Sequence, residues 1–94
     1  MHMNKKLMAL IIASTISSIS FACSKPEVPE LPDAATAVLA QMIKAQKDIK
    51  SYLKDGNDYL ACEKNTKRYD AAVDEMKSAG DKFNALVRDY KARS

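Results

Sequence analysis

The sequence predicts an all-α protein: an antiparallel two-helix hairpin with an extended, proline-rich N-terminal arm packed along it. Three observations predict this fold. Two stretches of the 94-residue chain carry apolar residues at alternating steps of three and four, which places them on one face of an α-helix. The resulting seven-residue repeat is typical of coiled coils and favours shallow packing against another helix. Before them, a proline occupies every third position.

Residues 1–22 are expected to be a cleaved signal peptide. Lys5 and Lys6 form a basic start, residues 7–13 are apolar, and Ser20-Phe21-Ala22 is a small-x-small cleavage site. The stretch is short and rich in serine, whereas a membrane span needs about 20 predominantly apolar residues. A retained anchor helix is the alternative. We therefore expect an exported protein that is periplasmic or secreted.

Composition speaks against nucleic-acid binding, metal binding and catalysis. Of the 15 basic side chains, Lys5 and Lys6 leave with the leader, so 13 remain against 12 acidic ones, without a basic stripe. The one histidine, His2, also leaves, and with it the commonest general base and neutral metal ligand. Two cysteines do not fill a four-ligand zinc site. We expect no enzyme, no cofactor and no metal.

The first element after the leader is an arm over residues 23–35. Pro26, Pro29 and Pro32 fix φ and push the residues before them into extended geometry, so the arm is expected to run as polyproline II. Val28 and Leu31 give it apolar side chains to bury. Two interpretations are open: a flexible tether, or an arm that lies along a helix groove.

The hairpin is predicted over residues 36–92, with its first helix at 36–63. Asp33 or Thr36 supplies a side-chain oxygen suited to cap the first turn. Residues 55–58, Asp-Gly-Asn-Asp, resemble a turn, but the repeat continues through them without a change of phase, so we expect the helix to continue. The expected inner face consists of Val38, Met42, Ala45, Ile49, Tyr52, Gly56 and Tyr59.

A turn at 64–67 is predicted to lead into the second helix at 68–92. Helices joined by a short loop pack as antiparallel neighbours. Gly56 and Gly80 both fall on inner faces, which indicates close backbone approach or a kink. Ala72, Ala79 and Leu86 lie beside the second stripe. The inner face expected here consists of Tyr69, Val73, Met76, Gly80, Phe83, Val87 and Tyr90.

A disulfide between Cys23 and Cys62 is the favoured interpretation of the two cysteines, because small exported domains use such bonds. An extended arm from Cys23 to Thr36 spans about 40 Å, and a helix from Thr36 to Cys62 spans about 39 Å. An arm folded back along the helix therefore brings the two cysteines together. Acylation of Cys23 as a lipoprotein remains an alternative, although residues 20–22 are a poor lipoprotein signal. Free, redox-active or intermolecular thiols are the others.

The chain also resembles a family of small exported bacterial helical-hairpin proteins of unassigned function. This resemblance implies an exported hairpin whose two cysteines pair, and it supplies no catalytic residues. The residues that carry it are Cys23 with its spaced prolines, Leu31-Pro32-Asp33, Gln41-Met42, Ala45, Lys50-x-Tyr52, Tyr59-Leu60-x-Cys62, Tyr69-x-Ala71-Ala72-Val73-Asp74-Glu75-Met76, Asp81-Lys82-Phe83-Asn84 and Arg88-x-Tyr90-Lys91.

The function predicted from these features is that of a structural or interaction protein of the bacterial cell envelope, acting by helix-mediated contact. Its apolar stripes are broader than one hairpin covers, which favours self-association or docking to an unknown envelope protein. The opposing interpretation is a monomer whose arm covers the remainder. A periplasmic small-ligand-binding protein that uses Tyr52, Tyr59, Tyr69 and Tyr90 is a second hypothesis. Membrane attachment is expected only if Cys23 is lipidated.

Overall fold

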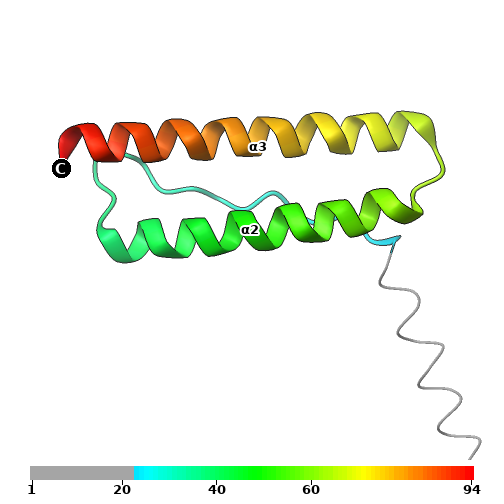
Figure 1. Cartoon of the computed structure of the whole chain (residues 1–94), viewed down its shortest axis with the longest axis horizontal. Coiled ribbons are helices and arrows are strands. Elements are labelled where there is room, and N and C mark those ends of the chain that lie inside the picture. The colour runs from blue at the N-terminus through cyan, green and yellow to red at the C-terminus, as the bar shows by residue number, and fades with distance from the viewer. Residues whose placement is uncertain (1–22) are drawn as a thin grey trace, which may run out of the picture.

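The computed structural model describes residues 23–94, and the predicted signal peptide at 1–22 lies outside this range. Within it the chain forms two α-helices, α2 at Leu39–Cys62 and α3 at Thr66–Arg93, joined by residues 63–65. The helices lie side by side and run in opposite directions (Figure 1). No strand occurs among the described residues. The prediction of an all-α, antiparallel two-helix hairpin is confirmed.

Helix α2 passes through Gly56 without a break, as the unbroken repeat predicts. Tyr52 lies one turn before this glycine and Tyr59 about one turn after it, and both are buried. A turn at residues 55–58 would have moved these two tyrosines onto different faces. Burial of both tyrosine rings on one face of a continuous helix therefore outweighs the local preference of Gly, Asn and Asp for a turn.

The start of α2 differs from the prediction, because Asp33 caps a separate turn instead of the helix. Its Oδ1 accepts from the Ala35 N–H (2.9 Å), and its carbonyl accepts from the N–H groups of Thr36 (3.2 Å) and Ala37 (2.9 Å). The helix begins three residues beyond the predicted position 36. There the Val38 N–H donates to Oε1 of Gln41 (2.9 Å). The prediction that Asp33 or Thr36 caps α2 is wrong.

Helix α3 begins at Thr66, two residues before the predicted position. Asn65 is its N-cap: its Oδ1 accepts from the Arg68 N–H (3.0 Å), which satisfies one of the free N–H groups of the first turn. Because Asn65 caps the helix instead of continuing a longer turn, the reversal takes residues 63–65 and not 64–67.

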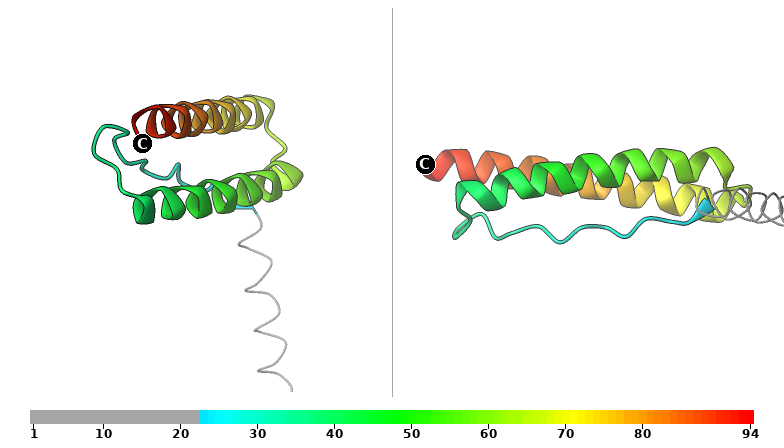
Figure 2. Two further views of the ribbon diagram at one scale, coloured as in Figure 1. Left: turned by 60° about the vertical axis from the view of Figure 1, so that its left-hand side comes forward. Right: turned by 90° about the horizontal axis from the view of Figure 1, so that it is seen from below.

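The arm runs back along the hairpin, beside both helices, from the α2–α3 loop to the opposite end (Figure 2). Cys23 is bonded to Cys62 at the loop end, with a Cα–Cα distance of 5.6 Å. Lys25 Nζ lies 2.6 Å from Oε2 of Glu75 on α3. At the far end, Arg93 Nε donates to the Ala34 carbonyl (2.6 Å) and its Nη2 donates to the Ala37 carbonyl. The arm is thus attached at both ends.

The core lies in the seam between the helices and consists of two clusters. One contains Ala37, Met42, Ala45 and Leu86, and the other contains Ile49, Tyr52 and Ala79. Leu31 of the arm packs against both clusters. The arm therefore forms a third, thin layer over one side of the seam.

Helix α3 turns a different column of its surface toward α2 than predicted. Its buried residues are Ala72, Ala79 and Leu86, whereas Tyr69 and Val73, predicted to face α2, are 40% and 39% exposed. Because alanine side chains are short, the column that contains Ala72 and Ala79 fits into the seam. The neighbouring column, which contains Val73, lies outside the seam. Val38, also predicted at the interface, precedes α2 and is 58% exposed. Of the other predicted interface residues, Met42, Ile49, Tyr52, Gly56 and Tyr59 are buried and Met76, Gly80, Phe83, Val87 and Tyr90 are half-buried.

Candidate functional site

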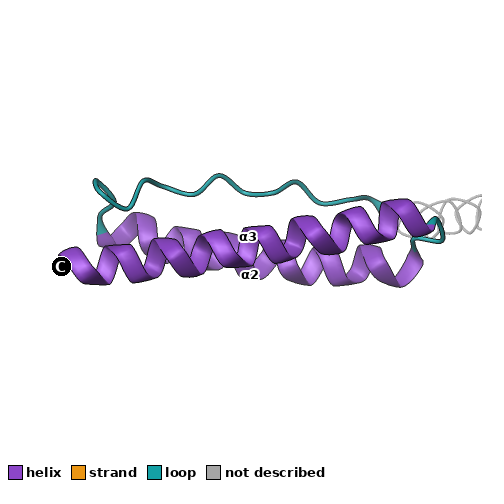
Figure 3. Cartoon of the chain, turned by 90° about the horizontal axis from the view of Figure 1, so that it is seen from above, coloured by secondary structure: helices purple, strands orange, loops and turns teal. Residues whose placement is uncertain are grey.

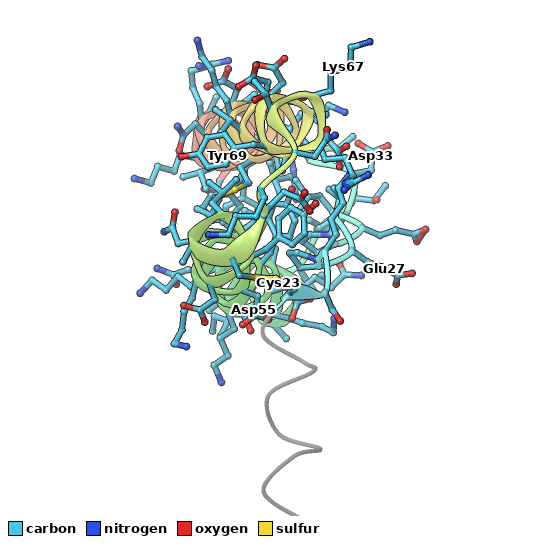
Figure 4. All side chains as sticks on the ribbon, turned by 90° about the vertical axis from the view of Figure 1, so that its right-hand side faces the viewer. Cys23, Glu27, Asp33, Asp55, Lys67 and Tyr69 are labelled. Carbon is cyan, nitrogen blue, oxygen red and sulfur yellow. A yellow bond between two sulfur atoms is a disulfide. The ribbon has the colours of Figure 1, made fainter. Side chains whose placement is uncertain are left out.

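The hairpin has two broad faces, and the arm covers one of them (Figure 3). We call the side under the arm the arm face and the opposite side the open face. Seen along the helices from the loop end, Glu27 and Asp33 of the arm project to one side and Tyr69 lies on the other (Figure 4). No segment of the described range, residues 23–94, crosses the open face (Figure 2).

An apolar groove lies between the helices toward the C-terminal end of α3, with a volume of about 440 Å³. Met42 is buried at the seam and Phe83 is half-buried. Leu39 and Ile43 on α2 remain 62% and 46% exposed. The groove is lined by Leu39, Met42, Ile43, Gln46, Phe83, Asn84, Val87, Tyr90 and Lys91.

Apolar residues extend from this groove toward the α2–α3 loop, and we call the whole row, from Val73 to the groove, the apolar strip. Val73 and Gly80 stand fourteen and seven residues before Val87, which lines the groove, so the three share one heptad column of α3. Leu53 stands seven residues after Gln46 on α2 and is half-buried. Apolar groups therefore follow nearly the whole length of the open face.

The two helix glycines have different surroundings. A Cβ added to Gly56 would lie 2.7 Å from Sδ and 2.9 Å from Cε of Met76, so Gly56 forms a notch that the Met76 side chain fills. A Cβ added to Gly80 would meet no atom within 4 Å. The sequence predicts close backbone approach or a kink at the inward glycines, whereas the close neighbour of Gly56 is a side chain. For Gly80 that prediction is wrong within the described chain, because α3 is rotated and Gly80 faces the open side.

The charged residues in the two columns beside the open-face groove are mostly lysines, which the nearly neutral composition does not reveal. Lys91 lines the groove, Lys77 lies fourteen residues before it in the same heptad column, and Lys50 lies seven residues after Ile43. In those two columns, the described residues include one carboxylate, Asp70. The arm face carries both signs of charge: the clefts between the arm and α2 are lined by Glu27, Glu30, Asp48 and Asp55 and also by Lys44, whose Nζ lies 2.6 Å from Oδ2 of Asp48.

The loop end is closed by hydrogen bonds around Glu63. Its Oε1 accepts from the Asn65 N–H (2.9 Å) and from Arg68 Nε (3.2 Å), while its Oε2 accepts from the Tyr59 hydroxyl (2.8 Å). The bond from Asn65, then those from Tyr59 and Arg68, lower the pKa of the Glu63 carboxyl. The same carboxylate, together with desolvation, raises the pKa of the Tyr59 phenol. This network holds the turn and the end of α2 that carries Cys62.

The four tyrosines do not converge on one site. Tyr52 and Tyr59 are buried in the seam, and desolvation raises the pKa of the Tyr52 phenol. Tyr69 is exposed near the loop, and Tyr90 lies at the other end, where the Arg93 guanidinium carbon stands 5.2 Å from its ring centroid. The set proposed for a ligand is therefore divided between the core and opposite ends of the open face.

The predicted cysteine pair is joined in the structure, at a sequence separation of 39 residues. Between Cys23 and Ser94 there is no group of three or more His, Cys, Asp or Glu side chains placed to hold a metal ion. Neither α2 nor α3 is long and apolar enough to cross a membrane.

Comparison with known proteins gives no relative: no family model, no curated protein and no solved structure matches this chain. The resemblance to small exported helical-hairpin proteins therefore stays a prediction. The candidate site rests on the geometry of the open face.

Proposed function

We propose that this protein is an exported interaction module of the bacterial cell envelope that binds a helix of another protein along its open face. One observation carries the proposal. Leu39, Ile43, Tyr69 and Val73 keep 39–62% of their surface exposed around the one side of the hairpin that the arm leaves uncovered. Single exposed apolar residues are normal, whereas a continuous apolar strip marks an interaction surface.

A helix is the occupant that this surface favours. The groove between two antiparallel helices accepts a row of side chains spaced at three and four residues, as in helix bundles. A third helix would bury Leu39 and Ile43 at one end and Val73 at the other, and would complete a bundle that two helices leave open on one side. Recognition of an amphipathic helix by an apolar groove is a common form of peptide binding.

Two features support export. The first is the leader-like sequence of residues 1–22. The second is the Cys23–Cys62 disulfide, a bond that persists in oxidising compartments such as the periplasm. Acylation at Cys23 would need the same Sγ atom that bonds Cys62. The lipoprotein alternative and the disulfide therefore exclude one another.

Intact mass of the protein recovered from cells tests the export proposal. We expect a chain that begins at Cys23, is two hydrogen atoms lighter than the dithiol, and is alkylated only after reduction. A mass raised by a diacylglyceryl group and an acyl chain would contradict it and would make Cys23 a membrane anchor.

Photo-crosslinking in cells tests the contact. A photoreactive phenylalanine replaces Ile43 or Val73 on the open face, and Asp58, exposed on α2, serves as the matched control position. We expect both open-face positions to give a defined protein adduct and Asp58 to give none. Equal labelling at all three positions, or no adduct from Ile43 and Val73, would remove the open face as the contact surface.

A small-ligand site is the weaker candidate. The groove volume of about 440 Å³ falls within the range of ligand pockets, about 300–1,000 Å³. However, such pockets enclose most of the ligand, whereas this groove is a trough along an exposed surface, and its polar lining is limited to Gln46, Asn84, Lys91 and the Tyr90 hydroxyl. A saturable thermal shift with a small molecule would favour this candidate.

A further inference from the structure

We infer that the partner helix is acidic and amphipathic, about 18 residues long, and approaches the hairpin most closely at Gly80, whereas a second copy of this chain is not the partner. This inference rests on the proposed function, since it names the chemistry of the helix that the open face receives. Three observations carry it: the surroundings of Gly80, the charges beside the groove, and the length of the apolar strip.

Gly80 has no packing role within the described chain. It lies in the interior of α3, where glycine is less favourable than alanine, yet a Cβ here would have no neighbour within 4 Å. It shares its heptad column with Val73 and Val87, so it forms a low point in the middle of the strip. Glycine on a helix surface allows close approach of another backbone. The space at Gly80 fits a helix that crosses there.

The charges beside the strip specify an acidic partner. Lys50 on α2 and Lys77 and Lys91 on α3 stand in the heptad columns next to the apolar residues, and Asp70 is the one carboxylate in those columns among the described residues. In paired helices, charges flanking the apolar seam select the partner by complementarity. A helix with Glu or Asp beside its apolar ridge would meet these lysines with opposite charge.

The same charges disfavour a second copy. A symmetric dimer places the same surface of each protomer against its partner. Two open faces in contact would bring the central Lys50 and Lys77 of one copy close to the same lysines of the other. Like charges at an interface oppose association, and Asp74 and Asp81, the carboxylates one turn from Lys77 on α3, stand in the next heptad column outward and not in that of Lys77.

A flat anionic membrane fits the surface less well than a helix. Met42 and Phe83 lie at the bottom of a groove between two helices. A flat bilayer would contact only the lysines at the rim of the groove. The side-chain ridge of a helix would enter the groove and contact its floor. The strip from Val73 to Lys91 covers 18 helical steps, about 27 Å. A single helix of about 18 residues matches this length.

The test uses the oxidised chain recovered from cells and two fluorescent synthetic helices of about 18 residues. Both peptides carry leucine and alanine on one face; glutamate flanks that face in one, and lysine in the other. Fluorescence anisotropy is expected to show at least tenfold tighter binding of the glutamate peptide, with the difference reduced at high salt. Gly80→Leu is expected to weaken that binding at least tenfold without lowering the unfolding temperature. Ser78→Leu, at an exposed position on the same helix, is expected to leave binding unchanged.

Several outcomes would overturn the inference. Equal binding of the two peptides would remove the charge argument, and unchanged binding by Gly80→Leu would remove the close approach. A wild-type dimer in analytical ultracentrifugation that Gly80→Leu dissociates would identify a second copy as the occupant. Sedimentation with phosphatidylglycerol-containing vesicles, lost in Lys50→Glu/Lys77→Glu, would identify a membrane if neither peptide binds.

The two proposals fail in distinguishable ways. Protein adducts at Ile43 and Val73 in cells, combined with failure of the glutamate peptide, would leave the contact function standing and overturn the acidic partner. Binding of the glutamate peptide without any adduct in cells would contradict the contact function and leave the chemistry of the open face as inferred.

Discussion

Gly56 and Gly80 occupy equivalent places in the two heptad repeats but have different neighbours. Met76 fills the space that a side chain at Gly56 would need, whereas the space at Gly80 is open. Sequence spacing places both glycines on an inner face, but it does not show which of them a neighbouring side chain covers. That depends on the rotation of α3 about its axis.

We expect Gly56→Leu to lower the free energy of unfolding by about 1–3 kcal/mol, because the new side chain must displace Met76 from a packed seam. The matched variant Gly80→Leu is expected to be neutral or to stabilise by up to about 1 kcal/mol, because leucine is a better helix former than glycine. Urea unfolding of the oxidised proteins measures both. Equal destabilisation by the two variants would contradict the rotation of α3 described above.

Glu63 links stability to pH at the α2–α3 loop. Its folded pKa lies below the usual value of 4.5, chiefly because the Asn65 N–H and the Tyr59 hydroxyl donate to the carboxylate. The ionised form is thus favoured by folding, so its contribution is complete above that value and is lost as the pH falls through the lower folded pKa.

For Glu63→Gln we therefore expect a lower unfolding temperature than wild type at pH 7, and a difference that shrinks as the pH falls below 4.5 and through the folded pKa, where the wild-type carboxylate becomes protonated. Tyr59→Phe, which removes one donor, is expected to weaken the pH dependence without abolishing it. Thermal unfolding followed by circular dichroism at several pH values provides the measurement. A difference between wild type and Glu63→Gln that stays constant with pH would contradict the role of the carboxylate.

At the scale of elements, the arm contributes to the core through Leu31. This residue contacts both core clusters, whereas Val28, three residues earlier, is 47% exposed. Leu31 is therefore the apolar side chain by which the arm packs against the seam, whereas Val28 leaves about half of its surface exposed.

We expect Leu31→Ala to lower the free energy of unfolding by about 1–2 kcal/mol, less than the 2–5 kcal/mol of a fully buried leucine, because Leu31 is only half-buried. Val28→Ala is the matched control and is expected to change it by less than about 0.5 kcal/mol. Chemical denaturation measures both. Equal effects of the two variants would show that the arm does not use Leu31 as its anchor.

Periodicity predicts the two helices and the continuation of α2 through Gly56, and the short loop between the helices predicts their antiparallel pairing. The prediction fails at two points for physical reasons. Asp33 has the side chain of a helix cap, but the same oxygen also closes an isolated turn, and the chain takes that option before α2 begins. On α3, the adjacent columns through Val73 and through Ala72 have similar apolar spacing. How closely the helices approach decides between them, and this is a tertiary property.

The whole molecule shows a charge pattern that no linear segment contains. Basic and acidic residues are interspersed along the sequence, and Lys50 on one helix and Lys77 on the other reach the same face only after the hairpin forms. The apolar character of the open face could therefore be predicted from the sequence, but the sign of the charge beside it could not.

The disulfide is expected to stabilise the entire fold, because Cys23 and Cys62 close a loop of the unfolded chain with a separation of 39 residues. Chain-entropy arguments give roughly 3–4 kcal/mol for such a loop. Denaturant unfolding with and without reductant checks this value. The Cys23→Ser/Cys62→Ser variant, expected to resemble the reduced protein and to be insensitive to reductant, is the control. An unchanged midpoint on reduction would contradict the expected stabilisation.

The same bond also determines which parts of the chain feel a mechanical load. If tension is applied between residue 23 and Ser94, it passes from Cys23 through the sulfur bridge directly into Cys62, so the arm and α2 lie in a covalent ring that carries no force. Only the 32 residues after Cys62 are able to extend. Their contour length is about 110 Å, against about 240 Å for the 71 residues after Cys23 once the bond is reduced. Under tension, α3 would peel away from a ring that stays intact.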